Sequence, residues 1–339
     1  MTSLGSENTL GLPCHAGRVV RALTEEDVVA LVQDVGNGRG RLTSALTILG
    51  GGSNVVLRRR LPGVVCLMRT RGFRQEPCKG GALVSAAAGE RWHDLVRYAL
   101  GQGLAGLENL ALIPGSVGAA PIQNIGAYGV ELSERFVSLR ALDIRLGRIV
   151  RFTARECDFA YRDSFFKRPD GEGFIILDVS IRLLRRAAPM ISYPDVQLEL
   201  ARLGRQRPSP AQVAEAVIRV RRRKLPDPRF TGNAGSFFKN PEVTLEAAAA
   251  ARATLPRLVE HPAPRGRIKL SAAQLIDACG WKGRSMGRAG VWRRQPLVLV
   301  NLGGAAAADI LALGEEIRRD VATRFGITLE LEPRVLGED

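Results

Sequence analysis

The chain has 339 residues, a formal net charge of +15 and 24% charged residues. This length is sufficient for two or three domains, each with its own core. No segment approaches the ~18 consecutive apolar residues that a membrane span requires, and the polar residues 1–11 do not resemble a signal peptide. The five cysteines are scattered without a Cys-x-x-Cys pair, which argues against a disulfide framework and against zinc. We therefore expect a cytoplasmic protein without a metal site.

The excess of basic residues suggests an anionic partner. Nucleic acid is the first candidate, because neutralised phosphates supply most of that kind of affinity. The arginines are spread along the chain, however, and the densest cluster, Arg219 to Lys224, ends a helix that Ser209 and Pro210 begin. Cations in a last helical turn are favoured by the helix dipole. We therefore expect no nucleic acid partner and no membrane partner, and anionic small molecules remain a good partner class.

The first half of the chain combines helix and strand signals. Thr24 begins a helix in the manner of a capping box. The elements expected after it are strands at Leu46–Leu49, Val55–Leu57, Val64–Met68 and Leu83–Ala88, a helix at Trp92–Leu100, a glycine-rich loop at Gly115–Gly129 and short strands between Val137 and Leu184.

The composition changes after Lys224–Pro228, which indicates a domain boundary. The last third is expected to contain helices at about 242–254, 271–279 and 306–325, and a strand at Leu297–Val300. This mixed α+β order differs from the regular strand–helix alternation of a doubly wound sheet.

Gly101–Gly106 satisfies the G-x-G-x-x-G pattern of dinucleotide-binding folds. That fingerprint requires a strand before it and a helix after it. Here a predicted helix precedes it, and Pro114 soon interrupts the segment after it. Gly101 is better explained as a helix C-cap, so we reject a Rossmann fold.

Two other glycine-rich segments are stronger candidates, Gly50–Asn54 and Pro114–Gly129. Consecutive small residues let several backbone N–H groups converge on one anion, which is how loops hold a diphosphate. The side chains of Ser53, Ser116, Gln123 and Asn124 offer further donors, and Tyr128 could stack or cap. Either loop alone could simply turn the chain. Together they suggest a large phosphate-bearing cofactor.

Ser236 lies between flexible glycines and bulky aromatics in Gly232–Pro241. Gly232 and Gly235 permit a tight backbone path, and the two phenylalanines that follow Ser236 would exclude water. A serine in this setting is a candidate proton donor or nucleophile. A turn at a strand edge, leading to a helix capped near Asn240, is the structural alternative.

Arg162 lies among aromatic residues in segment 157–167. An arginine there can bind a carboxylate through two parallel hydrogen bonds, with Tyr161 as a further donor. A structural ion pair with Asp163 is the alternative. Near the end of the chain, Leu329–Glu332 alternates like a strand, which would place both glutamates on one face.

Together these motifs resemble the UDP-N-acetylenolpyruvoylglucosamine reductase family, the MurB flavoenzymes of peptidoglycan precursor synthesis, in its long-loop subclass. The resemblance runs nearly end to end. The matching segments are Asn8–Gly11, Gly50–Asn54, Ile113–Glu131, Tyr161–Lys167, Lys224–Pro228, Gly232–Pro241, Ser271–Gly283 and the terminal Leu-Glu segment.

The resemblance implies an α+β fold in three parts. Two subdomains of the vanillyl-alcohol oxidase/PCMH type would bind FAD non-covalently, and a C-terminal α+β domain would bind the substrate. On this basis we expect FAD-binding subdomain 1 at residues 1–70, joined by a strand at about 333–339. Subdomain 2 would span 71–225 and the substrate-binding domain 226–332, in a monomer.

The family's reaction implies a role for each candidate residue. NADPH reduces the flavin, which then reduces the double bond of UDP-N-acetylglucosamine enolpyruvate to give UDP-N-acetylmuramate. The catalytic residues would be Ser236 as proton donor, Glu332 and Arg162. The cofactor contacts would be Gly50, Gly51, Gly52, Ser53, Asn54, Pro114, Gly115, Ser116, Gly118, Gln123, Asn124, Ile125, Gly126, Ala127 and Tyr128. The substrate contacts would be Tyr161, Tyr193, Lys224, Asn240, Gln295 and His261.

Two departures from the family pattern are visible. His261 stands where the long-loop subclass carries a tyrosine that closes over the diphosphate, and Pro333 replaces a valine after Glu332. An alternative function keeps the flavin fold but changes the chemistry. Other FAD-dependent oxidases and dehydrogenases often tether the cofactor through histidine or cysteine, and Cys14 and His15 lie early in the chain. A second alternative, a nucleic-acid-binding protein without enzymatic activity, lacks a recognised binding motif.

Overall fold

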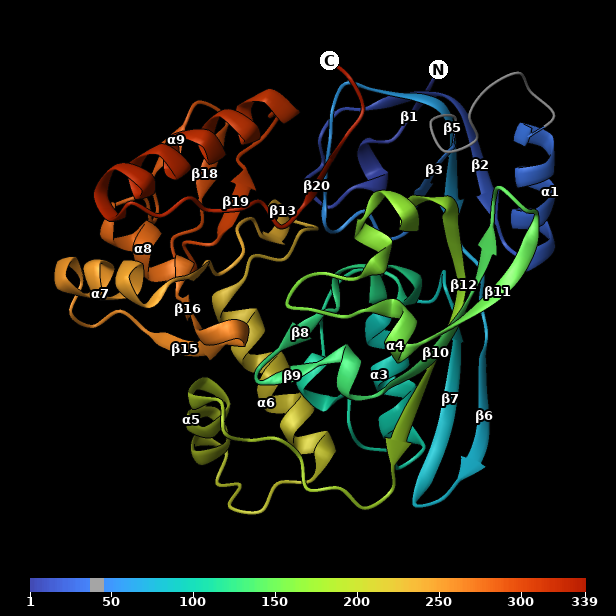
Figure 1. The fold of residues 1–339 in the computed structure, drawn as a ribbon, viewed down its shortest axis with the longest axis horizontal. Helices are drawn as coiled ribbons and strands as arrows, with labels where there is room; N and C mark the ends of the chain where they lie inside the picture. Colours follow the sequence, from blue (N-terminus) through green and yellow to red (C-terminus); the bar gives the residue numbers. More distant parts are fainter. Residues whose placement is uncertain (37–45) are drawn as a thin grey trace. The chain divides into compact units, whose positions relative to one another are not determined.

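The computed structural model describes residues 1–36 and 46–339 and divides into two compact units (Figure 1). The first unit comprises Met1–His15, Gly52–Leu61 and Arg222–Asp339. The second comprises Ala16–Gly51 and Pro62–Arg221. The predicted division into residues 1–70, 71–225 and 226–332 remains a prediction.

The second unit is built on a five-stranded antiparallel sheet in the order β11-β10-β12-β7-β6. Its longest strand, β12, is buried over most of its length and lies between β10 and β7 (Figure 1). The strands are β6 (Phe73–Cys78), β7 (Gly81–Ala87), β10 (Phe136–Asp143), β11 (Arg148–Thr153) and β12 (Phe174–Leu184).

A second sheet of this unit contains β2 (His15–Ala22), β5 (Arg60–Met68) and β3 (Leu46–Leu49), with β3 parallel to β5. Helix α1 (Glu25–Gly36) buries Val28 and Leu31 in a core shared with these strands. The predicted capping box is confirmed, because Asp27 accepts from Thr24 N while Thr24 Oγ1 accepts from Asp27 N.

The remaining elements of the second unit are short apart from three helices. These elements are α3 (Trp92–Gly101), α4 (Ala154–Cys157), α5 (Pro194–Arg202), the hairpin of β8 (Gly126–Ala127) and β9 (Val130–Glu131), and α6 (Pro210–Lys224), whose last three residues belong to the first unit. A helix precedes the G-x-G-x-x-G segment as expected, but Gly101 is not its C-cap: Gly101 is the last residue of α3, Gln102 is the C-cap and Gly103 adopts the positive φ of 66°. The loop expected over Gly115–Gly129 contains two 3-10 turns and β8.

The first unit combines a four-stranded sheet, order β13-β19-β18-β17, with a three-stranded sheet, order β14-β16-β15. Strand β20 runs parallel to β4. The strands are β1 (Thr2–Ser3), β4 (Val55–Leu57), β13 (Gly232–Ser236), β14 (Glu242–Val243), β15 (Glu260–Ala263), β16 (Arg267–Leu270), β17 (Ser285–Met286), β18 (Ala289–Val291), β19 (Val298–Asn301) and β20 (Arg334–Leu336). The helices are α7 (Leu245–Thr254), α8 (Ala272–Ala278) and α9 (Ala307–Phe325).

Three expectations for the first unit need correction. The helix expected from 242 begins only at Leu245, because Glu242 and Val243 pair with β16 and Thr244 then caps α7. The strand expected at Leu297–Val300 is β19, one residue later. Leu329–Glu332 is not a regular strand, since Leu331 makes only an isolated bridge to Phe238.

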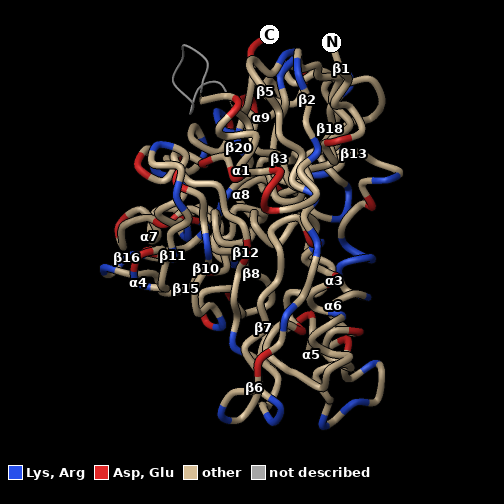
Figure 2. The backbone as a smooth tube through the Cα atoms, turned by 90° about the vertical axis from the view of Figure 1, so that its right-hand side faces the viewer, with Lys and Arg blue, Asp and Glu red and all other residues tan. Residues whose placement is uncertain are grey.

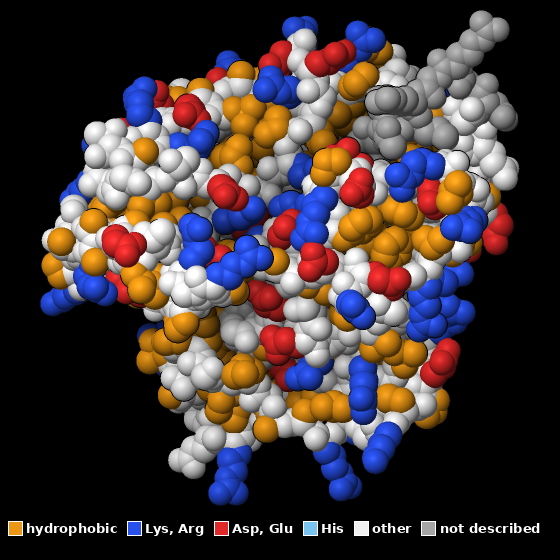
Figure 3. All heavy atoms as spheres, in the orientation of Figure 1, with side chains coloured by type: hydrophobic (Ala, Val, Ile, Leu, Met, Phe, Trp, Pro, Cys, Tyr) orange, Lys and Arg blue, Asp and Glu red, His pale blue; other side chains and the backbone are white. Residues whose placement is uncertain are grey.

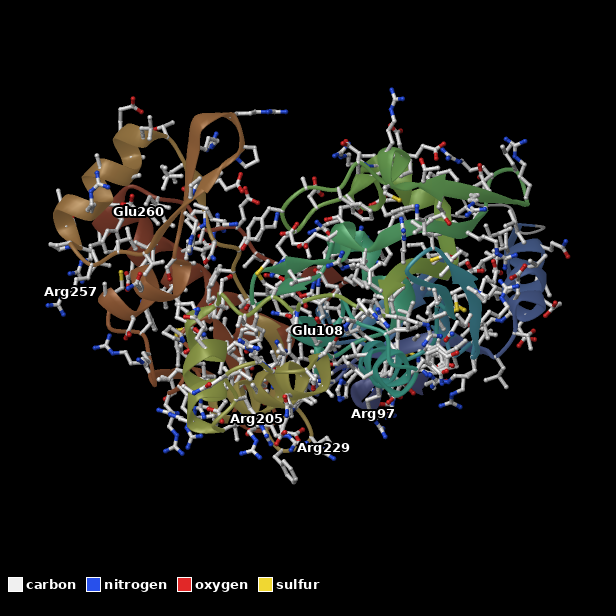
Figure 4. All side chains as sticks on the ribbon, turned by 90° about the horizontal axis from the view of Figure 1, so that it is seen from below. Arg97, Glu108, Arg205, Arg229, Arg257 and Glu260 are labelled. Atoms are coloured by element: carbon white, nitrogen blue, oxygen red, sulfur yellow. The ribbon has the colours of Figure 1, made fainter. Side chains whose placement is uncertain are left out.

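The basic residues do not gather on one element. Lys and Arg are distributed along the whole tube in Figure 2, and the face in Figure 3 intersperses them with acidic and apolar side chains. Arg97, Arg205, Arg229 and Arg257 are exposed and extend away from the ribbon in Figure 4. Solvated surface positions therefore account for much of the positive charge. No helix of the described residues is long and apolar enough to cross a membrane.

Candidate active site

In the second unit, two glycine-rich loops lie backbone against backbone. A Cβ on Gly51 would lie 2.9 Å from the Cα of Gly115, and one on Gly50 would collide with the Ser116 side chain. Arg69 holds the first loop through a hydrogen bond of 3.0 Å from Nη1 to the Gly50 carbonyl. Glycine at positions 50 and 51 therefore lets the two loops approach closely, with the Ser116 side chain against Gly50 and main chain against main chain at Gly51.

The second loop is anchored at both sides of Ser116. Trp92 N donates to the Gly115 carbonyl at 3.0 Å, and Val117 N donates to Glu90 O at 2.8 Å. Gly118 N donates to Ala88 O at 2.9 Å, and a Cβ on Gly118 would lie 2.6 Å from the Ala88 Cβ. Pro114 before this segment is exposed.

Asn124 holds the following turn together. It has a positive φ of 43° and is 1% exposed. Its Nδ2 donates to Glu131 Oε2 at 2.8 Å and to Ala160 O at 3.1 Å, and its Oδ1 accepts from Ser133 N at 3.0 Å. The side-chain amide of Asn124 is thus used in hydrogen bonds within the protein. We therefore expect Asn124 to contact a cofactor through its backbone. Gln123 and Ile125 flank it.

Arg162 lies against the hairpin that follows. Its Nη2 donates to the Gly126 carbonyl at 2.8 Å, and its guanidinium carbon is 5.1 Å from the ring centre of Tyr161. Lys167 Nζ donates to the Arg162 carbonyl at 3.1 Å, and Arg162 has a positive φ of 53°. Asp163 lies near Arg168 instead, 3.8 Å from Nη2.

Tyr128 and Tyr193 contact each other edge to face, with ring centres 5.1 Å apart and planes at 85°. Tyr128 lies in the β8–β9 turn and Tyr193 precedes α5. Burial raises the pKa of Tyr128 to about 12, and Arg221 opposes this rise through its charge and a hydrogen bond. Burial also raises the pKa of Tyr193. Both hydroxyls therefore stay neutral at physiological pH.

In the first unit, Ser236 ends β13 at an irregularity in its pairing with β19. Gly235 before it has a φ of 72°, which favours glycine, and its N–H donates to Asn233 Oδ1 at 3.1 Å. Phe237 N donates to Leu297 O at 2.7 Å, and the Phe237 and Phe238 side chains are each 1% exposed. The chain on both sides of Ser236 is therefore fixed.

Glu332 lies in the strand-like segment beside Ser236. Its N–H donates to Phe237 O at 3.0 Å, and Asn54 Nδ2 donates to its carbonyl at 3.3 Å. Glu330 is different, because its side chain is 74% exposed and forms an ion pair of 2.9 Å with Lys239. The two glutamates thus differ in exposure, and the Glu332 backbone is hydrogen-bonded to Phe237, the residue that follows Ser236.

Gly52, Ser53 and Asn54 of the first predicted cofactor loop belong to the first unit. A Cβ on Gly52 would collide with the Glu7 carbonyl. Thr9 N donates to Gly52 O at 3.0 Å, and Thr9 Oγ1 donates to Asn233 O at 2.6 Å. Thr9 thereby links the loop to β13, the strand that ends in Ser236.

The expected substrate contacts of the first unit lie on several elements. Lys224 ends α6, and its carbonyl accepts from Trp292 Nε1 at 3.0 Å. Asn240 Oδ1 accepts from Ala272 N, the first N–H of α8, at 3.0 Å, while Ser271 is the N-cap of that helix and Thr244 caps the helix that follows Asn240 in sequence. Gln295 Oε1 accepts from Leu297 N at 3.3 Å. His261 is exposed on β15, opposite Lys269 of β16.

The structure therefore groups the candidate residues by unit. Ser236, Glu332 and Asn54 come together in the first unit, and Arg162, Tyr161 and Gly126 in the second. Sequence reasoning missed Thr9, Asn109 and Arg221 as supports of these groups. Two adjacent polar residues, Glu108 and Asn109, in the otherwise apolar stretch Gly106–Ile113 are a signal for Asn109, but nothing local indicates its partners.

The second unit's loops fit a dinucleotide cofactor. The backbones at Gly51 and Gly115 lie so close that a Cβ on Gly51 has no room. In glycine-rich loops of this kind, main-chain N–H groups can hold a diphosphate. Of the two alternative tether residues, Cys14 is less suitable, because it is fully buried and burial raises the pKa of its thiol, whereas His15 is exposed. The residues present thus fit FAD that is bound by the two loops, without a covalent bond to Cys14.

Comparison with known proteins agrees with this site. The family model described as FAD binding domain matches residues 16–153, and the one described as UDP-N-acetylenolpyruvoylglucosamine reductase, C-terminal domain, matches residues 227–336. Relatives named UDP-N-acetylenolpyruvoylglucosamine reductase from Burkholderia pseudomallei (strain 668) and Azoarcus sp. (strain BH72) are each 51% identical to this chain. The alignments cover 98% and 97% of this chain and 95% of each relative.

A solved structure extends the comparison to the fold. The crystal structure of UDP-N-acetylenolpyruvylglucosamine reductase (MurB) from Thermus caldophilus matches with a TM-score of 0.66 and 26% identity, covering 99% of this chain and 98% of that chain. The site and the two matched domains define a FAD-dependent oxidoreductase, and the predicted fold class is confirmed. The chain belongs to the UDP-N-acetylenolpyruvoylglucosamine reductase family.

Proposed function

We propose that the protein reduces UDP-N-acetylglucosamine enolpyruvate to UDP-N-acetylmuramate, with NADPH as hydride donor, in peptidoglycan precursor synthesis. The observation that carries this proposal is 51% identity to a reductase of the family over 98% of the chain. Bound FAD would supply the hydride-transfer chemistry. The expected contacts to FAD are the two glycine-rich loops, Gly50–Asn54 and Pro114–Tyr128.

Arg162 is assigned to the substrate carboxylate. Hydride addition to the double bond leaves negative charge next to that carboxylate, and developing charge requires donors that are already oriented. The guanidinium carries five N–H donors in a planar fork. Its bond to Gly126 O and its contact with the Tyr161 ring support the assignment, because they restrict where the fork can point.

Ser236 is assigned as the proton donor to the substrate carbanion. A serine hydroxyl is a poor acid, so it can serve only if the carbanion is a strong base and the geometry is fixed. The hydrogen bonds of Phe237 N and O, to Leu297 and Glu332, support the second condition. Glu332 would stabilise or protonate the enol form.

The remaining polar candidates are assigned to the uridine diphosphate sugar. Lys224 and His261 offer cationic or hydrogen-bonding groups for phosphate, while Asn240, Gln295, Tyr161 and Tyr193 offer neutral donors. The protein would act as a cytoplasmic monomer, and size-exclusion chromatography with light scattering tests the oligomeric state.

Steady-state turnover of the purified, FAD-loaded protein tests the proposal. NADPH consumption should depend on UDP-N-acetylglucosamine enolpyruvate, and mass spectrometry should find a product heavier by two hydrogens. UDP-N-acetylglucosamine, which lacks the enolpyruvyl group, is the matched control and should not support turnover. NADPH consumption with peroxide formation, but without reduction of the enolpyruvyl substrate, would favour another flavin-dependent oxidase or dehydrogenase instead.

A further inference from the structure

Asn109 lies in a short 3-10 turn, Glu108–Leu110, whose residues are all buried. The turn is fixed at both ends. Gly106 N donates to Glu108 Oε2 at 2.6 Å, and Trp92 Nε1 donates to Leu110 O at 3.0 Å. Figure 4 labels Glu108, the residue before Asn109, within the second unit. Asn109 is 2% exposed and its backbone has little freedom to move.

The side-chain amide of Asn109 joins two separate loops. Its Nδ2 donates to the Tyr128 carbonyl at 2.9 Å and to the Met190 carbonyl at 2.9 Å. An amide nitrogen carries two hydrogens, and both are used here. A Cβ on Gly129 would lie 3.7 Å from Met190 Cγ, so the two loops also pack against each other beside the amide.

The first of these loops adopts an unusual conformation. Tyr128 and Gly129 are the central residues of the β8–β9 turn, with φ of 51° and 84°. Two-residue hairpin turns with two positive φ values favour Asn or Asp before Gly. A tyrosine in this place carries backbone strain that the surroundings must offset. The hydrogen bond from Asn109 to the Tyr128 carbonyl is one such interaction.

The two loops carry the Tyr128–Tyr193 pair. Tyr193 immediately precedes α5 and lies three residues after Met190. The hydrogen bond from Asn109 to the Met190 carbonyl therefore limits where the Tyr193 ring can lie. The edge-to-face contact of 5.1 Å requires both loops in register. Tyr193 nevertheless remains 41% exposed, so part of its ring is available to a ligand.

We propose that Asn109 is a positioning residue whose amide holds the Tyr128 turn against the Met190–Tyr193 segment, and so sets the affinity for the UDP-sugar substrate. The inference rests on the proposed function, in which Tyr193 contacts that substrate. Loss of the amide leaves two carbonyls without their donor and frees the tyrosines to separate. Ser236 and Glu332 belong to the other unit, and Arg162 keeps its own hydrogen bond to Gly126 on strand β8, before the Tyr128 turn, so the chemical step at saturating substrate should change little.

The test uses Asn109→Asp, which keeps the shape of the side chain but replaces the donor with an acceptor. Ser85→Ala is the matched control, because it removes a side-chain hydrogen bond of 2.7 Å to Ser180 in the sheet of the same unit. Calorimetry on FAD-loaded protein gives the dissociation constant for UDP-N-acetylglucosamine enolpyruvate, and turnover gives KM and kcat. We expect about 10-fold weaker binding and higher KM for Asn109→Asp. We expect the kcat of Asn109→Asp to stay within about 2-fold of wild type. The dissociation constant, KM and kcat of Ser85→Ala should also stay within about 2-fold of wild type.

A double-mutant cycle shows whether Asn109 acts through the tyrosine. In a Tyr193→Ala background, Asn109→Asp should weaken binding by less than about 2-fold. Unchanged affinity in the single variant, or the same 10-fold loss in both backgrounds, would overturn the inference. If Asn109→Asp does not fold, Asn109→Ser, which keeps one donor, should show a smaller loss of affinity in the same assay. Wild-type protein that binds no enolpyruvyl substrate would instead refute the proposed function.

Discussion

The guanidinium of Arg162 donates a hydrogen bond of 2.8 Å to the carbonyl of Gly126. Gly126 belongs to the loop predicted to hold the cofactor, and Arg162 was selected as the ligand of a substrate carboxylate. A Cβ on Gly126 would lie 3.1 Å from Arg162 Nη1, so the close approach depends on glycine. The structure thus joins a predicted catalytic group and a predicted cofactor loop within one unit.

Arg162→Lys should impair reduction of the enolpyruvyl substrate by about 10²-fold or more, because an ammonium cannot reproduce a planar fork of donors. Reduction of the flavin by NADPH should persist. Stopped-flow absorbance of each half-reaction measures the difference. Arg168→Lys is the control, since Arg168 forms a surface ion pair of 2.6 Å with Asp158. Normal substrate-driven reoxidation in Arg162→Lys would remove this residue from the mechanism.

Ser236→Ala should retain flavin reduction by NADPH and lose flavin reoxidation by the substrate by about 10²- to 10⁴-fold, the range for a general acid. The backbone at this position is held by main-chain hydrogen bonds, so the fold should survive the change. Ser285→Ala, at an exposed position of the same unit, serves as the control. If both half-reactions proceed normally in Ser236→Ala, the proton must come from another group.

Glu332→Gln and Glu330→Gln form a matched pair of neighbouring isosteric changes. Glu332 is partly buried beside Phe237, whereas Glu330 is 74% exposed in an ion pair with Lys239. Surface ion pairs contribute about 0–1 kcal/mol, so Glu330→Gln should leave both kcat and stability nearly unchanged. Glu332→Gln should lower kcat by at least about 10²-fold. Equal effects in steady-state assays would contradict the choice of Glu332.

Gly51→Ala should abolish or greatly weaken FAD binding, because the new Cβ would lie 2.9 Å from the Gly115 backbone and force the two loops apart. The measurement is the FAD content of the purified protein, with the melting temperature recorded in parallel. Gly101→Ala is the control, since a Cβ there meets nothing within 4 Å and its φ is negative. Full FAD occupancy in Gly51→Ala would show that the close contact is not needed for the cofactor.

Buried thiols and phenols predict a loss of stability at high pH. Burial raises the pKa of Cys157 from its ordinary value of 9.0 to about 12, so the folded state keeps a proton that the unfolded state releases between these values. The resulting stabilisation is complete below pH 9 and is lost as the pH rises toward 12. Tyr128 acts in the same direction between 10 and about 12.

Urea unfolding at about pH 8 and about pH 10.5 measures this loss. Cys157→Ala should show a smaller difference between the two pH values than wild type. Cys78→Ala, at a partly exposed position, should behave like wild type. An identical pH dependence in wild type and Cys157→Ala would contradict the role of the buried thiol.

Local signals in the sequence predicted much of the fold. The strands Leu46–Leu49 and Val55–Leu57 around Gly50–Asn54 are confirmed as β3 and β4, because an apolar run bounded by glycine depends on few distant contacts. Strand β6 (Phe73–Cys78) was missed. It lies at the edge of its sheet, includes Pro77 and alternates only between partly buried and exposed residues, so it carries no clear hydrophobic period.

The supports of the candidate site could not be predicted in the same way. Asn109 bonds to carbonyls of Tyr128 and Met190, which lie 19 and 81 residues away in sequence. Every residue has a backbone carbonyl, so the residue types at positions 128 and 190 do not indicate that they accept these hydrogen bonds. Likewise a helix capped near Asn240 was one interpretation of its segment, but Asn240 Oδ1 accepts from the first N–H of α8, beyond helix α7 and three intervening strands. The roles assigned to Ser236, Arg162 and Glu332 remain predictions.

The most direct test of the account is an anaerobic visible spectrum of the FAD-loaded protein, to which NADPH and then UDP-N-acetylglucosamine enolpyruvate are added. We expect NADPH to bleach the flavin absorbance and the enolpyruvyl substrate to restore it, with one equivalent of UDP-N-acetylmuramate formed for each flavin. Bleaching without recovery would show that the oxidising substrate is another molecule. A protein that binds no FAD on reconstitution would contradict the account as a whole.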